Sequence, residues 1–237
     1  CAFGRVALTS NTTGNYNNAF GDSALEKTST GSQNTAFGYQ ALEENTTASN
    51  NTAVGMQALT ANTTGANNVA VGSVALDANT TGQSLTALGM QALSANTTAS
   101  NNTGVGTNAL LVNTTGQYNT ACGVGTLSAN TTASNNSAFG YNALDQNTTG
   151  TLNVAVGSAA LDANTEGGYN TAVGYQAGTA NTTSNHMVAV GTNALKLNTT
   201  GTQNTAVGSQ CMQANTTGYN NVAVGMNALI SNTTGKE

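Results

Sequence analysis

The sequence predicts an all-β protein, a β-solenoid (parallel β-roll) of fourteen coils with seventeen residues each. The first observation behind this prediction is a repeat. A segment like Asn51–Gly65, N-T-A-V-G-M-Q-A-L-T-A-N-T-T-G, returns every seventeen residues through the 237 residues. The second observation is that one position of the repeat is always glycine, as at Gly4, Gly55, Gly106, Gly157 and Gly208. A short fixed period of this kind is typical of a stacked array in which each repeat contacts its neighbours.

The elements of one coil follow from its apolar positions. We number the positions of every coil from 1 to 17, with Cys1 at position 1, so that the constant glycine is position 4. Thr52-Ala53-Val54, at positions 1 to 3, is β-branched, small and apolar, which suits a short strand. The second apolar pair, Ala58-Leu59, predicts a second short strand. The coil would then contain two strands and two turns.

A helix over Met56–Ala61 is the competing interpretation, because Ala, Leu, Gln and Met favour helices. However, only about six residues separate the glycine from the following Asn-Thr-Thr, and isolated helices shorter than ~12–15 residues are marginal. The strand is therefore the better prediction.

The direction of the side chains decides what the coil buries. Neighbours in a strand point to opposite faces, so we expect Ala53 opposite Val54 and Ala58 opposite Leu59. In the interpretation we favour, alanines line a narrow interior, and Val54 and Leu59 belong to outward stripes that meet sister chains in a homotrimeric fibre. The opposite assignment, with Val and Leu inside, would suit a monomer. Glycine at position 4 is expected where the chain turns with positive φ or another backbone approaches closely.

The repeated Asn-Thr-Thr has two interpretations. Asn tolerates left-handed turns and bonds its own backbone, and stacked amides form ladders, so Asn62 and its equivalents are expected to close the coil. The alternative is N-glycosylation, with acceptor patterns at Asn11, Asn45 and Asn62. A further hypothesis is an ice- or glycan-binding face, which would need two parallel outward rows, such as Asn11 with Thr13.

Composition argues against several functions. The net charge is −5 and charged residues make up only 5%. Nucleic-acid binding needs a basic patch, which Arg5, Lys27, Lys196 and Lys236 are too few to form. No apolar run approaches the ~20 residues that cross a bilayer. The single histidine, His186, lacks recurring partners for a catalytic triad or a zinc site. We therefore expect no enzyme activity, no metal and no cofactor.

Two cysteines stand at apolar positions of the repeat. Cys122 replaces the usual Val or Phe at position 3, and Cys211 replaces Ala at position 7. We expect both to be buried free thiols. They lie five coils apart, roughly 24 Å at the inter-strand spacing, which is too far for an intrachain disulfide.

The pattern N-T-A-V-G-x-x-A-L-x-x-N-T-T-G resembles the repeats of tail-fibre-domain proteins, found in bacteriophage tail fibres and bacterial surface proteins. More distantly it is similar to the β-roll heads of trimeric autotransporter adhesins. The resemblance covers all of residues 1–237 and implies an extracellular, trimeric shaft or adhesive head.

From these observations we expect a single repeat array, either a segment of a longer fibre or a stackable filament unit. It would act as a structural or adhesive fibre on a cell surface or virion. Its partners would be copies of itself and, in the adhesive role, a surface glycan or receptor. The alternatives are a self-assembling filament and an ice- or glycan-binding solenoid.

Overall fold

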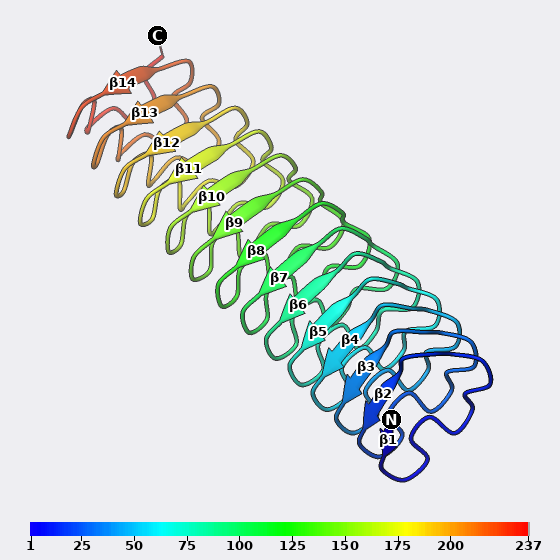
Figure 1. Ribbon diagram of the computed structural model, residues 1–237. Helices are drawn as coiled ribbons and strands as arrows, with labels where there is room; N and C mark the ends of the chain where they lie inside the picture. Colours follow the sequence, from blue (N-terminus) through cyan, green and yellow to red (C-terminus); the bar gives the residue numbers. More distant parts are fainter. Residues whose placement is uncertain (237) are drawn as a thin grey trace. The chain divides into compact units, whose positions relative to one another are not determined.

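The fold is all-β. The computed structural model describes residues 1–236, and these residues form fourteen short strands and no helix. The chain divides into two compact units, Cys1–Tyr118 and Asn119–Glu237. Each unit is a parallel β-solenoid with one strand per coil (Figure 1). The predicted β-solenoid is therefore confirmed, whereas the single array over residues 1–237 stays a prediction.

In both units, consecutive strands pair in parallel, and each residue lies beside its equivalent in the next coil, as Ala53 lies beside Ala70. The first unit contains β1 (Ala2–Phe3), β2 (Asn18–Phe20), β3 (Thr35–Phe37), β4 (Thr52–Val54), β5 (Val69–Val71), β6 (Thr86–Leu88) and β7 (Thr103–Val105). The second unit contains β8 (Thr120–Cys122), β9 (Ser137–Phe139), β10 (Val154–Val156), β11 (Thr171–Val173), β12 (Val188–Val190), β13 (Thr205–Val207) and β14 (Val222–Val224).

The predicted second strand is wrong, and the helix is not formed either. Positions 5 to 10 are a continuous turn, as in the segment that follows Gly55. Within it Gln57 has φ of 57° and Leu59 has φ of 53°, both in the left-handed region. The turn is nevertheless bonded between coils. The Gln57 N–H donates to the Tyr39 carbonyl of the preceding coil (2.8 Å), and the Leu59 N–H donates to the Ala75 carbonyl of the following coil (3.0 Å).

The left-handed residues also change which side chains are buried. Ala53, Ala58 and Leu59 are all fully buried, while Val54 is half-buried. The alanines therefore line the interior as expected, but the expectation that Leu59 faces outward is wrong. The side chains of this turn do not alternate as they would in a strand. Burying a leucine contributes about 1.5–3 kcal/mol, which is enough to offset the ~1–2 kcal/mol cost of its left-handed backbone.

Position 4 admits only glycine for two reasons. Gly55 has φ of 137°, and a Cβ placed there would lie 2.5 Å from the carbonyl oxygen of Gly72 in the next coil. Side chains rarely adopt that conformation, and no carbon can approach an oxygen so closely. This glycine therefore allows neighbouring coils to stack backbone against backbone.

Candidate interaction surfaces

Two rows of asparagine amides run through the interior of each unit. The first consists of the position-11 residues. Asn62 is fully buried. Its Nδ2 donates to the Gly65 carbonyl (2.9 Å) and to Oδ1 of Asn45 (3.0 Å), and its own Oδ1 accepts from Nδ2 of Asn79 (2.9 Å). Each amide thus closes its own turn and bonds the coils on either side.

The second row consists of the asparagines at position 17, interrupted by Leu85 and Met187, and it substitutes for strand pairing. The Asn51 N–H donates to Oδ1 of Asn34 (3.0 Å), and Nδ2 of Asn51 donates to the Gly65 carbonyl (2.9 Å). That carbonyl also accepts from Asn62, so the two rows meet on it. Because buried backbone groups need partners, these amides satisfy a stretch of coil that is not paired as a strand. The sequence showed that asparagine recurs at position 17, but not that it is buried.

The asparagine positions predicted as glycan acceptors do not share one environment. Asn45 and Asn62 are fully buried, and the Nδ2 atom that would carry a glycan already donates hydrogen bonds. Asn11 is exposed, and its Nδ2 donates to the Gly14 carbonyl (3.0 Å). This environment favours the turn interpretation for the folded chain.

The two-row face for ice or glycan binding is not formed as expected. The face was expected to consist of an asparagine row at position 11 and a threonine row at position 13. The asparagine row points inward, and only the position-13 threonines, such as Thr64, face solvent. The adjacent threonines at position 12 use their hydroxyls internally, since Oγ1 of Thr63 donates to the Thr80 carbonyl (3.0 Å). One exposed hydroxyl row remains.

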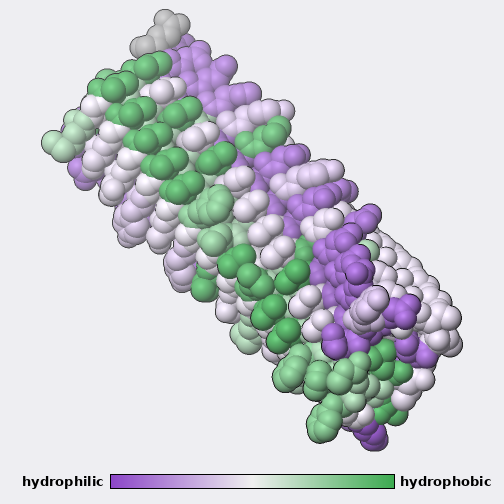
Figure 2. Space-filling model, viewed as in Figure 1, coloured by the Kyte–Doolittle hydropathy of each residue, from purple (hydrophilic) through white to green (hydrophobic). Residues whose placement is uncertain are grey.

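A stripe of apolar side chains covers the outer side of the strands. We call the apolar side chains at positions 3 and 5 the sheet-face stripe. Figure 2 shows hydrophobic surface following the strands labelled in Figure 1. The large apolar members that are 36–75% exposed are Phe3, Phe20, Phe37, Tyr39, Met56, Val71, Leu88 and Met90 in the first unit, and Val124, Phe139, Tyr141, Val156, Val173, Tyr175, Val224 and Met226 in the second.

Cys122 and Cys211 differ in exposure. Cys211 is buried, and burial raises the pKa of its thiol. Cys122 is exposed, so the expectation that it is buried is wrong. The reason is its place at position 3, whose side chains belong to the sheet-face stripe. Both are free thiols.

Titratable side chains are dispersed over the surface. Burial raises the pKa of Asp77, and burial together with the nearby Asp145 raises the pKa of Asp162. The ring of His186 stacks on Tyr169, with centroids 5.0 Å apart. Among the described residues, no three His, Cys, Asp or Glu side chains lie together in a group that could hold a metal ion. Residues 1–236 include no helix with the length and hydropathy needed to span a membrane.

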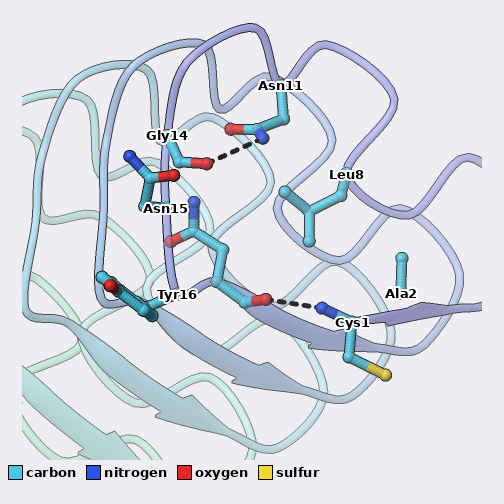
Figure 3. Close-up of a pocket in the computed structure, with 8 residues that line it drawn as sticks. Cys1, Ala2, Leu8, Asn11, Gly14, Asn15 and Tyr16 are labelled. Atoms are coloured by element: carbon cyan, nitrogen blue, oxygen red, sulfur yellow. Dashed lines mark hydrogen bonds between the residues drawn. The ribbon is translucent and has the colours of Figure 1, made fainter.

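A hollow lies at the first coil (Figure 3), and its lining matches interior positions of later coils. Leu8 and Asn11 line it, whereas their equivalents Leu59 and Asn62 are fully buried. Within it the Cys1 amino group donates to the Asn17 carbonyl (2.9 Å). Leu8 and Asn11 therefore belong to the coil interior, and Asn11 and Asn17 already form hydrogen bonds there.

Comparison of the chain with family models, with curated proteins and with solved structures finds no match.

Proposed function

We propose that this chain is a structural and adhesive protein of an extracellular fibre, in which sister chains pack through their sheet-face stripes as a homotrimer. The observation that carries the proposal is the stripe itself. It repeats along the strands of each unit, and it consists of Val, Leu, Phe, Met and Tyr side chains exposed to solvent.

The size of the stripe supports an interface rather than an ordinary surface. In each unit, eight large apolar side chains of the stripe are 36–75% exposed. If each leaves on the order of 50–100 Å² in contact with water, one unit exposes roughly 400–800 Å² of apolar surface. The largest patch on a typical monomer is about 300–600 Å², and a standard interface buries about 800 Å² per partner. Burial against copies of the same chain would remove this surface from water.

The resemblance to tail-fibre and adhesin repeats supports a trimer over other self-assemblies, and it also supports the extracellular location. One stripe on each unit is compatible with closed three-fold symmetry, because the stripes of three equivalent units can meet at a common axis. The proposed role is mechanical and non-catalytic. A surface glycan or receptor is the proposed adhesive partner.

Sedimentation equilibrium tests the proposal, and we expect the mass of three chains. Val173→Lys places a charge in the stripe and should shift the mass toward one chain while circular dichroism stays unchanged. Thr149→Lys, at an exposed position 13 in the same unit, is the matched control and should leave the trimer intact. A native chain that sediments as a monomer at every concentration would falsify the proposal. Large polymers would favour the self-assembling filament instead.

An ice- or glycan-binding solenoid is the second candidate, and the exposed threonine row at position 13 favours it. The Val173→Lys chain, if monomeric, allows a direct comparison. Thermal hysteresis or glycan-array binding by this monomer, abolished by Thr64→Lys and Thr81→Lys, would support the second candidate over the fibre.

A further inference from the structure

The position-3 ladder of the first unit is not uniform. It begins with three phenylalanines, Phe3, Phe20 and Phe37, and continues with Val54, Val71, Leu88 and Val105. The aromatic rings lie side by side. Those of Phe3 and Phe20 are tilted with centroids 6.4 Å apart, and those of Phe20 and Phe37 are stacked with centroids 5.8 Å apart. All three are exposed, at 74%, 37% and 58%. The ladder thus has an aromatic segment and an aliphatic segment.

In a repetitive interface, two chains can pair in several registers with similar contacts. A segment with different side chains can distinguish one register from the others. Equivalent residues of successive coils are separated by ~4.8 Å. If every position 3 were valine, two parallel chains could slide past one another by whole coils without any change in the contacts made at position 3. A surface without distinguishing features specifies its register weakly.

We infer that Phe3, Phe20 and Phe37 set the register between parallel copies of this chain. The inference rests on the proposed self-association through the sheet-face stripe. In register, the three aromatic levels of one copy face those of its partner. If one copy is shifted by two coils, only one of its three phenylalanines still faces a phenylalanine of the other copy. Its other two phenylalanines face the shorter side chains of Val54 and Val71. Aromatic rings and isopropyl groups differ in length, so shifted copies pack with gaps.

The charged residues beside the aromatic segment do not oppose this register. Arg5 and Asp22 occupy position 5 in the first two coils. Nη2 of Arg5 lies 3.2 Å from a carboxylate oxygen of Asp22 within the same chain. The Arg5 side chain is 82% exposed, and solvent screens exposed charges, so these charges contribute little to the choice of register.

Cross-linking within the first unit tests the inference. In a background of Cys1→Ser, Cys122→Val and Cys211→Ala, one chain carries Val71→Cys and an isotopically labelled chain carries Val105→Cys. The two are co-refolded and treated with a thiol cross-linker shorter than the ~10 Å rise of two coils. Mass spectrometry then counts links between residues 71 and 71, and between residues 71 and 105. The first reports the register, and the second reports a two-coil shift.

With the native aromatic segment we expect 71–105 links to be at least about tenfold rarer than 71–71 links, a ratio that corresponds to ~1.4 kcal/mol. The uniform ladder with Phe3→Val, Phe20→Val, Phe37→Val and Leu88→Val should remain oligomeric by sedimentation. Its 71–105 links should rise to within a few-fold of the 71–71 links. The matched control has Thr13→Val, Thr30→Val, Thr47→Val and Thr98→Val, at exposed positions 13 of the same four coils, and it should keep the native pattern.

The outcomes separate the two proposals. Abundant 71–105 links in the native ladder, or an unchanged pattern in the uniform ladder, overturn the register inference while self-association stands. A monomer without any interchain link overturns self-association itself, and the register inference with it.

Discussion

Two segments of one coil have nearly the same sequence pattern, but one is a strand and the other is a turn. Thr52-Ala53-Val54 and Gln57-Ala58-Leu59 both read polar, alanine, large aliphatic. The first is a strand whose valine is half-buried at the outer surface, and the second is a turn whose leucine is fully buried. In both segments the alanine is fully buried.

The difference lies in the backbone rather than in the hydrophobic pattern. Left-handed φ values of 57° at Gln57 and 53° at Leu59 break the alternation of side chains. In β4, by contrast, Ala53 points into the coil and its neighbours do not. Hydrophobic periodicity therefore identifies the apolar residues that recur in each short coil, but it does not show the direction in which each side chain points.

The largest expected effect tests the turn that separates the two segments. Gly55→Ala should destabilise the protein by about 4 kcal/mol or more, because a Cβ at φ of 137° would meet the Gly72 oxygen. Gly104→Ala is the matched control in β7. Its Cβ would meet the Ala109 oxygen at 3.3 Å, and other strands have alanine there, so a change within about 1 kcal/mol is expected. Urea unfolding measures both, and equal effects would contradict the close approach of the coils.

The second prediction compares the two aliphatic residues directly. Leu59→Ala should cost about 2–5 kcal/mol, because it leaves a cavity in the coil interior. Val54→Ala should cost less than about 1 kcal/mol in the unassembled chain, since Val54 is half-buried. Thermal and urea unfolding of the two variants below the association concentration provide the measurement. The reverse order would mean that valine, not leucine, faces the interior.

The smallest effect tests the left-handed backbone itself. Val74 and Val71 belong to the same coil, but Val74 has φ of 59° whereas Val71 lies in β5. Val74→Asn should stabilise the chain by roughly 0.5 kcal/mol, because asparagine tolerates the left-handed region better than a β-branched residue. Val71→Asn should destabilise it by about 1 kcal/mol, since asparagine disfavours strands. Opposite signs in urea unfolding are expected, and a loss of stability in both variants would argue against strain at Val74.

Much of the fold follows from the repeat. The period of seventeen residues, the constant glycine and the apolar positions predicted a parallel solenoid with a strand at Thr52–Val54, as the structure has it. The second strand could not be excluded from the sequence, because glutamine, alanine and leucine give no signal for left-handed conformations. Gly125 and Gly178 replace the usual residues at positions 6 and 8 with φ of 67° and 60°. Together with the asparagines at position 6, such as Asn108 and Asn142 with φ of 60° and 51°, they mark those positions as turns.

The candidate interface was predictable in part for the same reason. The sequence predicts an outward row at position 3, and its side chains are exposed or half-buried in the structure. Position 5, where Tyr39, Met56 and Tyr175 add to the exposed stripe, was not recognised, because its mixture of polar, aromatic and aliphatic residues has no constant character. The position-8 leucines were assigned to the wrong face.

The sequence by itself determined the spacing of the coils and the residues that must lie in register, because a strict period aligns each residue with its own equivalents in the neighbouring coils. Only the tertiary structure decided which of these residues face inward. Asn51, Leu59 and Asn62 are buried because left-handed turns and coil-to-coil hydrogen bonds direct them into the narrow interior. The valines and phenylalanines of the strands remain outside, because the interior is already occupied by the alanines, leucines and asparagines of the same coils.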